Sequence, residues 1–101
     1  MELTVIDRLS LLNILPTEDS IESMLIVKDI KEKLNFSKEE NDLFKEKYPE
    51  GQIPLESPEH NIEKDFSSSE LAFLKDCIQK VSSAKKVKAE MLNSLLKVKS
   101  A

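Results

Sequence analysis

The sequence predicts a mainly α-helical, compact bundle of about five helices, and three observations support this fold class. Apolar residues recur at spacings of three and four along most of the chain, as on the buried face of a helix. Two Ser-x-x-Glu helix-start signatures, at Ser37 and Ser67, mark where helices begin. The chain has one glycine in 101 residues, which leaves few tight loops. Its length and 40% apolar content suit a single domain over residues 1–101.

The first helix is expected over residues 3–15, because Val5, Leu9 and Leu12 lie on one side of it and further apolar residues widen that surface. We expect this helix to be mostly buried at the centre of the fold. Pro16 ends it. The second helix is expected over residues 20–35, with Thr17 and Ser20 as alternative N-caps. Its predicted buried face consists of Ile21, Met24, Val27, Ile30 and Leu34.

The Ser37 signature predicts a third helix over residues 38–48 that adds Leu43, Phe44 and Tyr48 to the core. Residues 49–66 contain three prolines and the only glycine, and apolar residues alternate with polar ones around Ile53 and Ile62. This alternation favours a short β-hairpin, which would give the helix and strand order of a winged helix. An extended, ordered loop is the alternative.

The Ser67 signature predicts a fourth helix over residues 68–82, whose apolar seam runs through Leu71, Leu74, Ile78 and Val81. The seam resumes in a different phase from Ala84 to Val98. Because Ser82 and Ser83 mark the break, we expect two helices packed as a hairpin, the second over residues 85–99.

The composition argues against catalysis. His60 lacks neighbouring ligands at metal-binding spacing, and we expect it to be a solvent-exposed loop residue. Cys77 lies between apolar positions of the fourth helix and is expected to be a buried, unreactive thiol. A single glycine excludes the phosphate-cradling loops of nucleotide-binding proteins. We therefore expect no enzymatic activity, no cofactor, and no catalytic, cofactor-binding or metal-binding residues.

Charge is distributed unevenly along the chain. Residues 75–101 hold seven lysines and two acidic residues and carry +5, whereas residues 1–74 hold eight basic and 17 acidic residues and carry −9, which gives the net charge of −4. Four of the lysines cluster around the predicted turn between the last two helices: Lys80, Lys85, Lys86 and Lys88. Such a cluster is either a solvated surface or a docking site for an acidic partner.

Two segments of the chain resemble small uncharacterised proteins encoded by bacteriophages and prophages. They are Leu3 to Leu9 with the following Leu12 to Pro16, and Val27 to Leu34 followed by the Ser37 signature. The resemblance spans most of the chain and implies an origin in a mobile element. It implies no function.

We therefore predict a small, non-catalytic protein-interaction module, such as a phage accessory, assembly or host-inhibitory factor. Its candidate partner-binding residues are the four clustered lysines. Leu92 and Leu96 form a second apolar row on the last helix and predict an oligomer face, with a homodimer as one outcome. The alternative is a nucleic-acid-associated regulator that uses the lysines or a winged-helix-like face, although Arg8 is the only arginine for base readout.

The compartment follows from cysteine content and hydropathy. A single cysteine fits a reducing environment, and no apolar run approaches the roughly 18 residues that span a membrane. We expect a cytoplasmic protein without membrane association, located in the host cytoplasm if a phage encodes it.

Overall fold

The computed structural model describes residues 1–52, 54 and 58–101 and, within them, is mainly α-helical with one small antiparallel sheet, which confirms the predicted fold class. The α-helices are α1 (Val5–Ile14), α2 (Ile21–Leu34), α3 (Lys38–Lys47), α4 (Ser68–Ser83) and α5 (Leu92–Lys99). The strands are β1 (Glu2–Leu3) and β2 (Ile62–Glu63), and single 3-10 turns occupy Pro58–His60 and Ala89–Met91.

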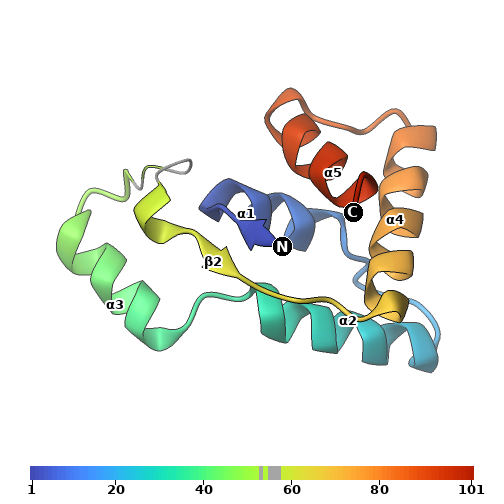
Figure 1. Cartoon of the computed structure of the whole chain (residues 1–101), viewed down its shortest axis with the longest axis horizontal. Helices are drawn as coiled ribbons and strands as arrows, with labels where there is room; N and C mark the ends of the chain where they lie inside the picture. The colour runs from blue at the N-terminus through green and yellow to red at the C-terminus, as the bar shows by residue number, and fades with distance from the viewer. Residues whose placement is uncertain (53, 55–57) are drawn as a thin grey trace.

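Helix α1 lies at the centre of the bundle, between α2, α4 and α5 (Figure 1). Val5, Leu11 and Ile14 are buried in the core, as expected of a central helix. The helix begins at Val5 and not at residue 3, because the Thr4 side chain caps it and Leu3 belongs to β1. Leu9, predicted to face the core, is exposed, since the buried side of α1 is turned toward Asp7 and Leu11.

The two-stranded sheet joins the N-terminus to the segment before α4. Glu2 lies opposite Glu63, and Leu3 lies opposite Ile62. The backbone N–H of Lys64 also donates to the carbonyl of Met1 at 3.0 Å. The strand predicted near Ile62 is therefore present, but β2 pairs with β1, a partner 60 residues earlier in the chain. The other predicted strand includes Ile53 and Leu55, which lie outside the described residues.

Helices α2 and α4 bury the central parts of their predicted faces. Val27, Ile30 and Leu34 of α2 lie in the core with Leu74, Cys77 and Ile78 of α4. The first residue of the predicted α2 face, Ile21, is 79% exposed, and the helix begins at this residue.

The chain between α4 and α5 reverses direction through a Schellman motif. Lys86 N–H donates to the carbonyl of Val81 and Lys85 N–H to that of Ser82, both at 3.0 Å, and Lys85 takes the left-handed conformation with φ +58°. The last helix therefore starts at Leu92, later than the predicted residue 85. The expected change of phase is present, since Met91, Leu95 and Val98 are buried, although Ala84 is exposed.

Helix α3 lies apart from the four helices of the bundle (Figure 1). Phe44 is its buried anchor; Tyr48 is half-buried, and Leu43, predicted to join the core, is 47% exposed. His60 packs edge-on against Phe44, with ring centroids 5.0 Å apart, and lies 3.0 Å from the Tyr48 hydroxyl. The expectation that His60 is exposed is wrong, because this aromatic cluster encloses it.

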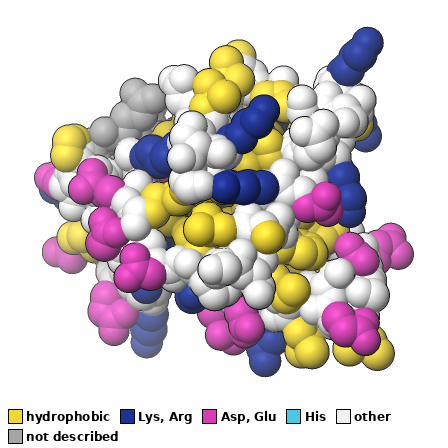
Figure 2. All heavy atoms as spheres, turned by 45° about the vertical axis from the view of Figure 1, so that its right-hand side comes forward, with side chains coloured by type: hydrophobic (Ala, Val, Ile, Leu, Met, Phe, Trp, Pro, Cys, Tyr) yellow, Lys and Arg dark blue, Asp and Glu magenta, His cyan; other side chains and the backbone are white. Residues whose placement is uncertain are grey.

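Side chains of different kinds separate on the surface where α4 and α5 come forward (Figure 2). Hydrophobic side chains gather in the middle of this face, lysines lie across and above them, and acidic side chains lie around the edges. The predicted functional residues lie on α4, on α5 and in the segment between them.

Candidate protein-docking face

Three carboxylates at helix starts are occupied by internal contacts, and each performs two tasks. Asp7, Glu40 and Glu70 each accept the backbone N–H of the N-cap residue three positions earlier, completing capping boxes with Thr4, Ser37 and Ser67. The same oxygen atom also accepts a bond from a basic side chain of another helix. We call these three arrangements the capping latches.

In the capping latch of α3, Arg8 of α1 holds Glu40. Its guanidinium nitrogens lie 2.6 and 3.1 Å from the two carboxylate oxygens, and other N–H groups donate to the backbone carbonyls of Leu34 and Asn35. The guanidinium also lies over the Phe36 ring, with its Cζ atom 3.9 Å from the ring centroid. With 1% of its surface exposed, the only arginine of the chain joins α1, the end of α2 and the start of α3.

In the capping latch of α1, Asp7 is buried between α1 and α5. It accepts bonds from the Ser94 hydroxyl at 2.6 Å and from the Lys97 ammonium. Burial by itself would raise the pKa of Asp7, but the bonds from Lys97, Ser94 and the Thr4 backbone outweigh it and lower the pKa. Asp7 is therefore a structural anion that ties the last helix to the first.

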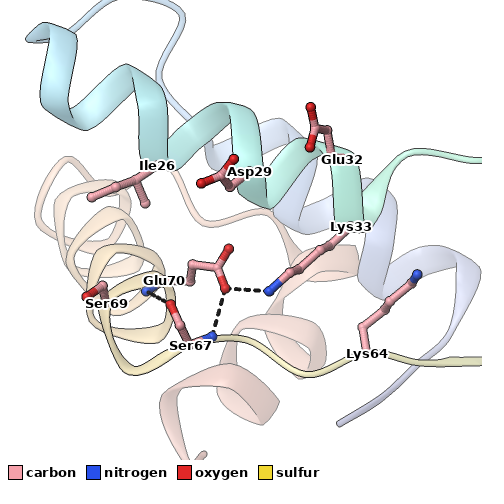
Figure 3. Close-up of a pocket in the computed structure, with 8 residues that line it drawn as sticks. All are labelled: Ile26, Asp29, Glu32, Lys33, Lys64, Ser67, Ser69 and Glu70. Carbon is pink, nitrogen blue, oxygen red and sulfur yellow. Dashed lines mark hydrogen bonds and ion pairs between the residues drawn. The ribbon is translucent and has the colours of Figure 1, made fainter.

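In the capping latch of α4, Lys33 of α2 lies 2.6 Å from Glu70 (Figure 3). The pair lines an open hollow of about 470 Å³ between α2 and the start of α4, which Asp29, Glu32 and Lys64 also line. Burial opposes the charge of Glu70, yet Lys33 and the Ser67 N–H lower its pKa overall. Lys33 and Glu70 satisfy each other, whereas Asp29, Glu32 and Lys64 form no ion pair with any described residue.

No metal centre is formed by the part of the chain that the structure describes, where no group of three or more His, Cys, Asp or Glu side chains converges. Cys77 is buried as expected, and burial raises the pKa of its thiol. The thiol is therefore held in its unreactive, protonated form at neutral pH.

The clustered lysines differ from these paired charges. Lys80 is joined to Asp76 one helical turn away at 3.2 Å, and both side chains are largely exposed. Lys85, Lys86 and Lys88 are exposed and form no ion pair with any described residue. We call the four residues Lys80, Lys85, Lys86 and Lys88 the lysine turn.

The lysine turn leads into the exposed side of α5. Leu92 and Leu96 are 48% and 49% exposed and lie one helical turn apart, so that they form one apolar row. The opposite side of α5 contributes Leu95 and Val98 to the core. The predicted division of the last helix into a buried and an outer apolar row is therefore seen in the side-chain burial.

A groove of about 310 Å³ between α1 and the segment before α5 was not predicted from the sequence. Its apolar lining comes from Ile6 and Leu9 of α1 and from Met91, and Lys88 and Glu90 line it as well. The sequence signal that could have indicated it is the breadth of the apolar surface on α1, which is wider than one neighbouring helix can cover.

Comparison of the chain with protein families, curated protein sequences and solved structures found no match. Among the described residues, no helix is both long and apolar enough to cross a membrane.

Proposed function

We propose that this chain is a non-catalytic protein-interaction module, and that its docking face consists of the lysine turn and the apolar row Leu92 and Leu96. An accessory, assembly or host-inhibitory role in a bacteriophage or prophage belongs to the same proposal. The observation that carries it is the grouping of three exposed lysines, which form no ion pair with any described residue, with the half-exposed leucines that follow them on α5.

The chemistry of this face defines the partner. Two half-exposed leucines offer apolar surface whose burial contributes about 25 cal/mol per Å². Lysines at the rim of such a contact attract an acidic surface and speed association more than they strengthen the final complex. The partner is therefore a protein surface that combines apolar side chains with Asp or Glu.

Affinity capture with matched variants tests the proposal. Leu92→Ser combined with Leu96→Ser removes the apolar row, and Leu43→Ser on α3 is its control, because Leu43 is equally exposed at 47%. We expect a specific protein to be captured by the unmodified chain and by the Leu43 variant, and to be lost from the double variant. Capture that is equal for all three would contradict the proposed face.

The nucleic-acid alternative predicts a different result on the same face. DNA or RNA binding would depend on the lysine turn, weaken steeply with salt and survive the loss of Leu92 and Leu96. Titration of the chain with DNA and RNA over a range of salt distinguishes the two functions. We expect no salt-sensitive complex with either nucleic acid.

A further inference from the structure

We propose that the start of α2 is a second docking face and that its occupant is the α5 side of another copy of this chain, so that copies associate head to tail. This inference rests on the proposed use of the lysine turn and the α5 row as a docking face. It adds the surface that the docking face meets.

The α2 surface is the most exposed apolar feature among the described residues. Ile21 is 79% exposed and Leu25 is 57% exposed, and they lie one turn apart on the same side of the helix. The sequence pattern predicts Ile21 to be in the core, so its outward position leaves an apolar side chain without an internal partner. Leu25 continues this surface along the helix.

Acidic residues lie before α2 and in its first turn, next to this apolar surface. Glu18 and Asp19 precede the helix, and Glu22 lies in its first turn. All three are exposed and form no ion pair with any described residue. Together with Ile21 and Leu25 they make what we call the α2 face.

The two faces match in form and are opposite in charge. Each presents a pair of apolar side chains four residues apart on a helix, Ile21 and Leu25 on one and Leu92 and Leu96 on the other. The α2 face is flanked by three unpaired carboxylates, and the α5 row follows three unpaired lysines. Opposite potentials of this kind favour and orient association.

Charge also decides which faces meet. Two α5 sides brought together would place lysine turns near each other, and two α2 faces would oppose carboxylates, so both contacts between like faces are repulsive. A contact between the α2 face of one copy and the α5 side of the next pairs opposite charges. Such a heterologous contact leaves one face of each kind free and extends unless a ring closes.

The decisive experiment mixes two variants that each lack one face. One carries Ile21→Ser and Leu25→Ser, and the other carries Leu92→Ser and Leu96→Ser. Sedimentation velocity is measured at low salt over a range of concentrations. We expect the unmodified chain to gain mass with concentration, each variant alone to remain monomeric, and their equimolar mixture to form a 1:1 complex that does not extend.

Three results would overturn the inference. They are an unmodified chain that stays monomeric at the highest concentration, an Ile21 and Leu25 variant that still associates by itself, and a mixture that remains monomeric. The second result would indicate a symmetric α5 contact. Leu43→Ser should associate like the unmodified chain, and far-UV circular dichroism of every variant establishes that its helices are intact.

Charge reversal gives a second test that leaves the apolar side chains in place. One variant carries Glu18→Lys and Glu22→Lys, and the other carries Lys85→Glu and Lys86→Glu. Each variant alone should associate more weakly than the unmodified chain. Mixing the two should restore association, because the α2 face of each variant is then opposite in charge to the α5 side of the other. Absence of rescue would overturn the inference.

The experiments separate failure of this inference from failure of the proposed function. The Ile21 and Leu25 variant retains the α5 side, so it should still capture a different acidic partner. Monomeric behaviour of the unmodified chain together with α5-dependent capture overturns head-to-tail association alone. If neither partner capture nor self-association is reduced by the Leu92 and Leu96 substitutions, both proposals are overturned.

Discussion

The helix starts of α1, α3 and α4 and the segment between α4 and α5 use charged side chains in opposite ways. Each of the three helix starts combines a capping box with a cation from another helix. The carboxylate and the cation therefore neutralise each other within the fold. Neither the turn at Ala89–Met91 nor α5 has a side-chain N-cap bond, and the lysines before them project into solvent.

This difference separates the charges that stabilise the fold from those available to a partner. Asp7, Arg8 and Glu70 are buried, and their removal would leave polar groups unsatisfied in the core. Lys85, Lys86 and Lys88 contribute no ion pair among the described residues. The lysine turn, whose three unpaired lysines are not committed to the fold in this way, is the region that we assign to binding.

Low pH should have the largest effect on stability, because it protonates the carboxylates of all three capping latches together. The pKa values of Asp7, Glu40 and Glu70 lie below their ordinary values of 3.8, 4.5 and 4.5. The unfolded chain therefore takes up protons first, and the free energy of unfolding falls as the pH drops from about 5 through the lowered pKa values. Urea denaturation at a series of pH values measures this. Stability that is unchanged between pH 6 and pH 3 would contradict the assignment.

Loss of Arg8 should cause the largest change of any single substitution. Arg8→Met leaves Glu40 without its cation and the carbonyls of Leu34 and Asn35 without their donors. Breaking a buried ion pair costs about 3–5 kcal/mol of unfolding free energy, and urea denaturation at neutral pH should show it. Arg8→Lys keeps the charge but not the bidentate contact, so its free energy of unfolding should lie between those of the unmodified chain and of Arg8→Met. A loss under about 1 kcal/mol for Arg8→Met would show that the latch contributes little.

The helix starts show how far the sequence could predict the capping latches. Ser37 and Ser67 were located correctly as N-caps, because a capping box is a local pattern within four residues. The Thr4 and Asp7 box was missed, since Asp replaces the usual Glu and the helix was predicted to begin at Leu3.

The cations of the capping latches could not be predicted in the same way. Arg8 and Glu40 are separated by 32 residues, and Asp7 and Lys97 by 90, so only the tertiary fold brings them together. The same limit applies to exposure. Ile21 and Leu92 both fit helical apolar patterns, but which side of a helix meets the core depends on neighbours that a single segment does not specify. The lysine turn was predicted because a loop between two helices is exposed in almost any packing.

Asp7→Asn should have an intermediate effect on stability. The substitution keeps the size of the side chain but removes the charge that Lys97 contacts and weakens the bond from Ser94. We expect a loss of about 1–3 kcal/mol, measured by urea denaturation at neutral pH. The matched control is Asp76→Asn, which breaks the exposed pair with Lys80 and should change stability by less than about 0.5 kcal/mol. Equal losses for the two substitutions would show that burial of Asp7 has no energetic importance.

The smallest effect on the fold, and the largest on binding, should come from reversing the charge of the lysine turn. Lys85→Glu, Lys86→Glu and Lys88→Glu together should change the free energy of unfolding by less than about 1 kcal/mol, because none of the three pairs with a described residue. A control with Lys28, Lys38 and Lys45 changed to Glu carries the same charge change on α2 and α3, away from the proposed face.

Capture of the protein partner by these two triple variants, measured beside their stability, tests the central claim most directly. The account predicts that both variants fold with nearly unchanged stability, and that only reversal of the lysine turn abolishes capture. Equal capture by both variants, or loss of stability comparable to that of Arg8→Met when the lysine turn is reversed, would contradict the division between fold-stabilising and partner-binding charges.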